Sequence, residues 1–249
     1  TEMISAKALR FCNKKTFALA DVAESEAPIA VQLFGSDPAD FAYAIPCLED
    51  YMGKNIVLFD INMGCPAPKI VNNGEGSALM QHPTLAAQII DAAKRRTKLP
   101  VTAKIRKGFR EPNAGEFAET LEQAGVDAIA MHGRLRTEYY SGEADSLSIK
   151  AVVEAVRVPV VANGDIFSPE AAENMLAQTG AAGIMVARGA LGNPFLFSQI
   201  HDYFESGTYT QPSLADIAHA MLSHANIAAS LKGEPFALIE FRKHAAWYI

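Results

Sequence analysis

Short apolar runs alternate with segments of helical spacing along most of the chain. The apolar runs, each closed by a loop, lie at 29–35, 56–59, 101–105, 128–133, 159–165 and 182–189, and the residues around Met3 predict the end of a further strand. The segments with helical spacing lie between them, at 38–53, 83–96, 116–124, 149–156 and 169–178. Strands that alternate with helices in this way predict parallel βαβ units.

The pattern changes after Pro194. Residues 195–205, 213–231 and 234–249 have helical spacing and contain no predicted strand. We therefore expect an α/β domain at 1–194 and the start of a helical domain at 195–249. The last predicted helix has no end signal before Ile249, and only the end of a strand precedes residue 5. We accordingly expect a sequence that is truncated at both ends.

Polar residues stand where the apolar runs end. They are Gln32, Asn62 with Cys65, Lys104, His132, Asn163 with Asp165, and Arg188. A barrel gathers its ligand contacts from strand ends all round the ring, whereas a doubly wound sheet concentrates them at one switch point. The distribution favours a (β/α)₈ TIM barrel with its first strand missing, followed by a partial α-helical domain. A doubly wound sheet is the alternative.

Composition narrows the class of protein. The chain has 249 residues, of which 49% are hydrophobic and 20% charged, which suits one large globular domain with or without a small appendage. No apolar run reaches the ~18 residues that span a bilayer, and no signal peptide is visible. Three cysteines without CxxC spacing fit a reducing cytoplasm. The net charge of −6 argues against a broadly basic nucleic-acid binder, although local basic patches are compatible with it.

The stretch from Asp60 to Lys69 has the most distinctive chemistry. It follows the buried run 56–59 and brings Asn62, Gly64, Cys65 and two prolines together, so the strand ends in an irregular loop. A thiol at the carboxyl end of a strand stands where α/β proteins keep their catalytic groups. The competing interpretation is a small buried filler, because free cysteines are often buried.

The other strand ends carry groups that are individually ambiguous. Lys104 could be a solvated surface lysine, His132 a structural histidine, and 163–165 an ordinary turn. Their joint occurrence, with Arg188 after the last strand where barrels commonly bind phosphate, favours a phosphate-bearing organic cofactor. No metal-ligand constellation, phosphate loop or serine elbow is present. Flavin mononucleotide (FMN) suits such a site, with its phosphate on the last loops and Lys104 and Gln32 at its ring.

The sequence resembles the bacterial tRNA-dihydrouridine synthases, and most closely their B-type branch. The resemblance extends over the whole chain and is carried by stretches that occur in order: 1–3, 31–35, 60–71, 76–80, 104–108, 132–134 with 140–142, 163–166, 188–194 and 242–244. The most specific are Ile-Asn-Met-Gly-Cys-Pro at 61–66, Asn-Gly-Asp at 163–165 and Ala-Arg-Gly-Ala-Leu-Gly-Asn-Pro at 187–194.

The resemblance implies an FMN-binding barrel, followed by a helical domain that helps to hold tRNA. It implies that NADPH reduces FMN, that a hydride passes to C6 of a uridine in tRNA, and that Cys65 gives the proton to C5. The implied FMN contacts are Gln32, Lys104, His132, Asn163, Gly164, Asp165, Ala187 and Arg188. The residues expected near the substrate are Asn62, Lys69, Arg134 and Arg136.

Two other functions stay open at this point. One is an FMN-dependent dehydrogenase of a free pyrimidine, of the dihydroorotate type, which also uses Lys and Asn at strand ends. The other is a non-catalytic RNA-binding remnant. Arg106, Lys107, Arg110, Arg134 and Arg136 predict a basic mouth that meets tRNA phosphates, and this mouth, with the helical appendage, favours the tRNA enzyme. We expect a cytoplasmic monomer that binds no metal and no membrane.

Overall fold

A computed structural model describes residues 1–249, apart from the side chain of Glu24. The chain forms two compact units. The first contains residues 1–163 with 178–183, and the second contains 164–177 with 184–249. Among the described residues, no helix is both long and apolar enough to cross a membrane.

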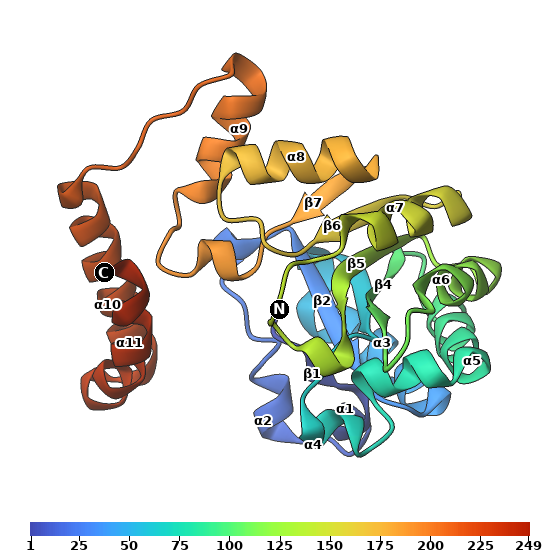
Figure 1. Cartoon of the computed structure of the whole chain (residues 1–249). Coiled ribbons are helices and arrows are strands. Elements are labelled where there is room, and N and C mark those ends of the chain that lie inside the picture. Colours follow the sequence, from blue (N-terminus) through green and yellow to red (C-terminus); the bar gives the residue numbers. More distant parts are fainter. The chain divides into compact units, whose positions relative to one another are not determined.

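One sheet contains all the strands, in chain order (Figure 1). They are β1 (Ile4–Ser5), β2 (Ile29–Phe34), β3 (Ile56–Asn62), β4 (Val101–Gly108), β5 (Ala128–Leu135), β6 (Val160–Asn163) and β7 (Gly183–Met185). The pairings from β1 through β6 are all parallel. A doubly wound sheet would reverse its strand order at a switch point. The unbroken order is that of a TIM-barrel-like α/β fold, which confirms the predicted class.

Helices follow the strands along the chain. They are α1 (Ala6–Arg10), α2 (Lys14–Phe17), α3 (Pro38–Met52), α4 (Pro68–Val71), α5 (Pro83–Lys94), α6 (Ala114–Gln123), α7 (Ser146–Ala155), α8 (Pro169–Thr179), α9 (Leu196–Ser206), α10 (Leu214–Lys232) and α11 (Glu234–Tyr248). Short 3₁₀ turns lie at 24–26, 53–55, 76–81, 136–138 and 188–190. In the first unit, α1 contacts α3, α3 contacts α5, α5 contacts α6 and α6 contacts α7, so neighbouring strands are covered by neighbouring helices.

The strands of the first unit separate apolar from polar side chains by alternation. Successive side chains of a strand point to opposite faces, and residues paired across a ladder share a face. One face of β2, β3 and β4 therefore carries Val31, Leu33, Phe59, Ile61, Val101, Ala103 and Ile105, all fully buried. The other face carries Gln32, Asp60, Asn62, Thr102 and Lys104. The first face packs in the core, and the second is available for chemistry.

Side-chain caps set where two helices begin. The Asp37 carboxylate accepts a hydrogen bond from the Ala39 N–H, and Pro38 occupies the first turn of α3. The Asp145 carboxylate accepts from the Ser148 N–H, so α7 starts at Ser146. The sequence pattern predicted a later start, at 149. The spacing of apolar residues marks only the first apolar position of a helix, so it gives no signal for the polar first turn.

In the second unit, two glycines stand where the backbone approaches itself closely. A Cβ at Gly189 would overlap the Ile166 carbonyl oxygen, and one at Gly192, whose φ is +68°, would overlap the Trp247 carbonyl of α11. Within the α10–α11 pair, the His224 ring stacks edge-on against Phe241 with centroids 5.0 Å apart, and its Nδ1 lies 3.3 Å from the Tyr248 hydroxyl. The helices α9, α10 and α11 correspond to the three helices predicted after residue 194.

We predict that β3 is far more sensitive to truncation at its buried positions than at the exposed position near its start. Phe59 is fully buried, whereas Val57 on the same strand is 41% exposed. Phe59→Ala should lower the free energy of unfolding by about 3–5 kcal/mol because it leaves a cavity. Val57→Ala should change it by about 0.5 kcal/mol. Urea unfolding of both variants measures the difference, and equal losses would contradict the placement of Phe59 in the core.

Candidate active site

The strand ladder brings polar residues from three strands to one level. Gln32 is paired with Asp60, and Asp60 is paired with Thr102. Two residues further along the strands, Asn62 is paired with Lys104. Asp60 and Asn62 lie in the last three residues of β3, and Thr102 and Lys104 meet them at this level although β4 runs on to Gly108. Because the strands are parallel, the end of β3 faces the side on which barrels place their active sites.

Four of these residues form a continuous set of hydrogen bonds, which we call the amide network: Gln32, Asp60, Asn62 and Thr102. Gln32 Nε2 donates to Asp60 Oδ2 at 2.6 Å, and Thr102 Oγ1 donates to Asp60 Oδ1 at 2.6 Å. Asn62 Nδ2 in turn donates to Gln32 Oε1 at 2.9 Å. Asp60 and Asn62 are each only 8% exposed, so the network is shielded from competing water.

The network ends at the Cys65 loop, residues 63–67. Asn62 Oδ1 accepts hydrogen bonds from the backbone N–H of Cys65 at 2.8 Å and of Gly64 at 3.2 Å. Behind the loop, the Ser77 N–H donates to the Cys65 carbonyl at 3.0 Å. Gly76 has a φ of +59°, and a Cβ there would lie 2.9 Å from the Cys65 oxygen. Only glycine fits that approach, so the thiol stands on a closely supported loop.

A buried arginine ties the Cys65 loop to the turn after β5. Arg106, 3% exposed, donates from Nε to the Gly64 carbonyl at 2.9 Å. Its Nη1 donates to the carbonyls of Leu135 at 3.0 Å and Tyr139 at 3.1 Å. Burial lowers the pKa of the Arg106 guanidinium. These carbonyl contacts offset part of the cost of burying its charge.

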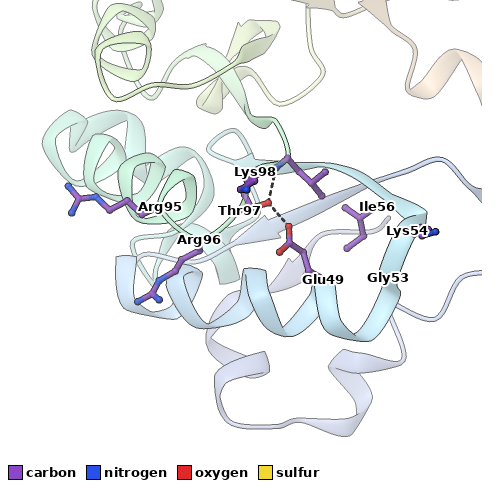
Figure 2. Close-up of a pocket in the computed structure, with 9 residues that line it drawn as sticks. Glu49, Gly53, Lys54, Ile56, Arg95, Arg96, Thr97 and Lys98 are labelled. Carbon is purple, nitrogen blue, oxygen red and sulfur yellow. Dashed lines mark hydrogen bonds between the residues drawn. The ribbon is translucent and has the colours of Figure 1, made fainter.

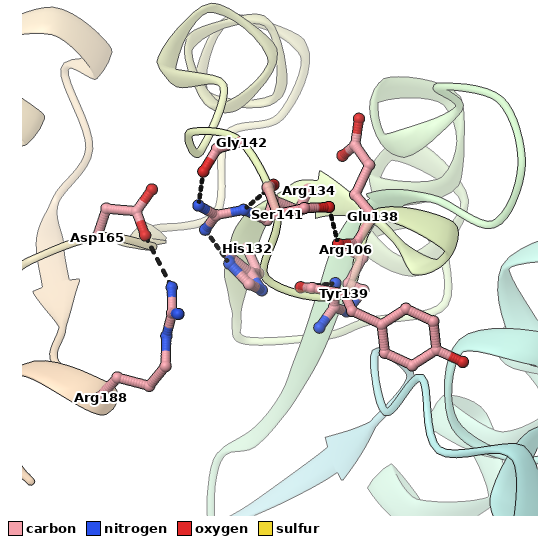
Figure 3. A network of polar contacts seen from close by, with 9 residues as sticks. All are labelled: Arg106, His132, Arg134, Glu138, Tyr139, Ser141, Gly142, Asp165 and Arg188. Carbon is pink, nitrogen blue, oxygen red and sulfur yellow. Dashed lines mark hydrogen bonds and ion pairs between the residues drawn. The ribbon is translucent and has the colours of Figure 1, made fainter.

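A second buried arginine shapes the same turn (Figure 3). Arg134, 1% exposed, donates to the carbonyls of Ser141 at 3.0 Å and Gly142 at 2.6 Å. Its Nη1 lies 3.2 Å from His132 Nε2, so the same guanidinium also fixes the histidine ring. The direct substrate contact predicted for Arg134 stays a prediction. Its burial favours a supporting role for the turn that carries Tyr139.

Arg136, in the same turn, makes cation–π contacts with two aromatic rings. Its guanidinium lies 5.2 Å from the ring centroid of Phe109 and 5.9 Å from that of Tyr139. Tyr139 is 40% exposed and has a φ of +50°, which is a strained conformation for a side chain of this size. This group presents an aromatic face and a cation at the strand-end side of the first unit, a combination that suits an unstacked base.

Lys104 is the group that most resembles a cofactor contact. Lys104 is half-buried, and burial lowers its pKa to about 8. The negative charge of Asp60 acts in the opposite direction and raises the pKa. Among the described residues, none lies close enough to form an ion pair with its ammonium. A partly buried cation without a partner, beside acceptor-rich amides, fits an electron-rich or anionic edge of a ring. The first unit therefore fits a flavin.

In the second unit, Arg188 and Asp165 form an ion pair at 2.9 Å, and the Arg188 guanidinium lies 5.6 Å from the Phe167 ring centroid. Asp165 has a φ of +52°, and Gly164 precedes it. Ala187 immediately precedes the 3₁₀ turn at 188–190. Asp165 and Arg188 thus join residues 164–165 to residues 187–188 within this unit by a charged pair. A phosphate could bind to Arg188 in place of the Asp165 carboxylate.

The other predicted residues lie as follows. Asn163 is the ladder partner of His132, at the end of β6. Lys69 is exposed on α4, next to the Cys65 loop along the chain. Lys107 pairs with Asp145 at 2.7 Å, which helps to lower the Asp145 pKa to about 2, so this lysine already has an anionic partner. Asp60, Thr102 and Tyr139 were not predicted as site residues. The polar alternation of Asp60 and Asn62 could have indicated the first.

A pocket of about 640 Å³ lies at the opposite, N-terminal ends of β3 and β4 (Figure 2). Glu49 and Thr97 are hydrogen-bonded in its centre. The cations around it, Lys54, Arg95 and Arg96, point outward in different directions in Figure 2. They do not converge on one ligand, so the strand-end site remains the candidate. No group of three or more potential metal ligands occurs among the described residues.

Comparison with known proteins identifies relatives over the whole length. The chain matches the family described as dihydrouridine synthase over residues 1–249. A probable tRNA-dihydrouridine synthase of Rickettsia bellii is 40% identical, covering 100% of this chain and 76% of that protein. tRNA-dihydrouridine synthase B of Pseudomonas aeruginosa is 38% identical, covering 100% and 75%. The enzyme of the same name from Vibrio parahaemolyticus is 41% identical, covering 92% and 71%.

We predict that Lys104 makes stability depend on pH in the flavin-free protein. Its pKa of about 8 lies below the ordinary lysine value, so between about pH 8 and 10.5 the unfolded chain binds the extra proton. Stability attributable to this site therefore rises with pH through that window. Lys104→Met should be more stable than the wild type at pH 7 by about 1–2 kcal/mol, a value discounted for partial exposure.

This advantage should shrink as the pH rises from about 8 to 10.5. Urea unfolding at several pH values measures it, and Lys98→Met, at an exposed position, corrects for the loss of one charge. A stability difference that stays constant across the window would contradict the assignment.

Proposed function

Because the chain belongs to the dihydrouridine synthase family, we propose that it reduces uridines in tRNA to 5,6-dihydrouridine. The observation that supports this most directly is the support given to Cys65. Asn62 and Ser77 hold its backbone from two sides, and Arg106 holds the preceding carbonyl. A residue that only filled space would not need three polar supports, whereas an acid that must meet one carbon atom does.

Cys65 acts in this proposal as the proton donor to C5 of the uracil ring. An ordinary thiol has a pKa of ~8.5 and is mostly protonated at neutral pH, so it can serve as a general acid. Cys65 is partly exposed, so a uracil base can approach its side chain. The target base has to leave its stack to reach a strand-end site.

The cofactor of the proposal is FMN, with NADPH as the reductant. When bound, FMN supplies the hydride that reduces C6 of the uracil ring. Lys104, Gln32, His132 and Asn163 would hold its ring. Gly164, Asp165, Ala187 and Arg188 would hold its phosphate, with the Asp165–Arg188 pair opening to admit it. The unpaired ammonium of Lys104 supports this assignment, because a ring edge would supply the partner it lacks.

The substrate contacts of the proposal come from Asn62, Lys69, Arg134 and Arg136. Lys69 is exposed and can meet a phosphate directly, whereas Arg134 contributes through the turn that it holds. We place the catalytic domain at 1–194 and the tRNA-holding helical domain at 195–249. We further propose that the protein acts as a cytoplasmic monomer.

The first test concerns Cys65. Cys65→Ala should leave flavin binding and NADPH oxidation nearly intact, while dihydrouridine formation falls by roughly 10²-fold or more, the scale of a lost general acid. Single-turnover reduction of unmodified tRNA by pre-reduced protein, followed by nucleoside mass spectrometry, isolates the step that needs the proton. Wild-type rates for this variant would remove Cys65 from the mechanism.

Two cysteines of the same chain serve as matched controls. Cys12 is exposed and Cys47 lies in α3, so neither is at a strand end. Cys12→Ala and Cys47→Ala should cost stability at most and leave the single-turnover rate unchanged. If Cys65→Ala instead lost stability without a specific loss of turnover, Cys65 would be a packing residue.

The second test concerns the cofactor. Lys104→Ala should lower the flavin occupancy of the purified protein, because the variant removes the cation that faces the ring. The ratio of visible flavin absorbance to protein absorbance measures occupancy, and exposed Lys98→Ala is the control. Wild-type protein that contained no flavin and could not be reconstituted with FMN would overturn the assignment.

A further inference from the structure

We propose that Asp60 is a positioning residue, which fixes the orientation of the Gln32 and Asn62 amides and through them the place of Cys65. The catalytic importance of this role rests on the proposed function, whereas the effect of Asp60 on the place of the thiol does not. Asp60 contacts neither the thiol nor, in our proposal, the cofactor. It acts through two other side chains.

The hydrogen bonds of the amide network have a fixed direction because its groups differ in which atoms can donate. An ionised carboxylate is an acceptor only, whereas a Gln or Asn amide presents a donor on one side and an acceptor on the other. Asp60 accepts at Oδ2 from Gln32, so the Gln32 amide nitrogen has to face Asp60. The Gln32 oxygen then faces Asn62 and can only accept, so the Asn62 amide nitrogen has to face Gln32.

The last link carries this direction to the thiol. With its nitrogen committed to Gln32, Asn62 turns its oxygen toward the Cys65 loop, where two backbone N–H groups donate to it. A flipped Asn62 would bring its own N–H₂ against those N–H groups, and donors facing donors repel. One acceptor-only group at the start of the series thus determines the polarity of three successive contacts.

The surroundings keep Asp60 in this role. The carboxylate is 8% exposed, and Thr102 donates to its second oxygen at 2.6 Å, so both oxygens are occupied by neutral donors. The charge of Asp60 also interacts with the Lys104 ammonium, whose pKa it raises against the effect of burial. Gln32, Asp60 and Thr102 are ladder partners on adjacent strands, so the backbone sets the spacing of the series.

The test replaces the acceptor-only group by a group of the same shape. In Asp60→Asn, the amide at position 60 can present either its oxygen or its nitrogen to Gln32, so the direction of the series is lost. In flavin-free protein, the rate at which iodoacetamide alkylates Cys65 should rise about five-fold, the scale on which one net hydrogen bond shifts a local equilibrium. Peptide mass spectrometry assigns the alkylation to Cys65 among the three cysteines.

A double variant separates positioning from simple loss of a buried charge. In Asp60→Asn with Gln32→Glu, the carboxylate moves to position 32, accepts from the amide at position 60, and still accepts from Asn62. The Asn62 oxygen again has to face the Cys65 loop, so alkylation of Cys65 should return to within about two-fold of the wild-type rate. Asp91→Asn, which alters an exposed pair with Arg95, is the control and should change nothing.

The outcomes are distinct. Asp60→Asn with a wild-type alkylation rate, or a double variant no better than the single one, overturns the inference. In protein that contains bound flavin, Asp60→Asn should also lower the single-turnover rate on tRNA about ten-fold. The KM for tRNA should stay within about two-fold of the wild-type value. If the wild type fails to reduce tRNA, the proposed function fails, but the alkylation series still decides the role of Asp60.

Discussion

The parallel register of β2, β3 and β4 is the constraint on which the site depends. It pairs Gln32 with Asp60, Asp60 with Thr102, and Asn62 with Lys104, so that polar side chains two residues apart along each strand form two adjacent levels on one face. A slip of one residue on β3 would exchange Asp60 for Phe59 or Ile61 and put an apolar side chain where the amide network lies. The same register buries the opposite face, so packing energy enforces the geometry of the chemistry.

Arginines then fix the loops that extend beyond the strands. Arg106 and Arg134 are almost fully buried, and most of their partners are backbone carbonyls of the Cys65 loop and of the turn at 136–142. A guanidinium holds several carbonyls at once in a fixed planar geometry, whereas the donors of a lysine ammonium rotate freely. The arginines and lysines of this part of the chain are therefore divided between loop support and exposed positions.

The sequence predicted the α/β class and the order of strands and helices, because alternation and helical spacing follow from burial. It ended two strands too early: β4 runs past Lys104 to Gly108, and β5 runs past His132 to Leu135. It also drew attention to Cys65, since a thiol with Asn62 and Gly64 at a strand end is an uncommon combination. The buried roles of Arg106 and Arg134 could not be predicted. Their partners are carbonyls of a turn whose path depends on the tertiary fold, including the positive φ of Tyr139. The direction of the amide network likewise needs coordinates, because a sequence does not show which amide atom faces which neighbour.

The account is tested most directly by asking which pyrimidine the protein reduces. Purified protein with bound flavin is supplied with NADPH and either unmodified tRNA or free orotate and uracil. The account predicts dihydrouridine in the tRNA, detected by nucleoside mass spectrometry, and no turnover of the free pyrimidines. Reduction of a free pyrimidine with tRNA left unchanged would contradict it, because the supported thiol and the aromatic group at Tyr139 would then serve a different substrate.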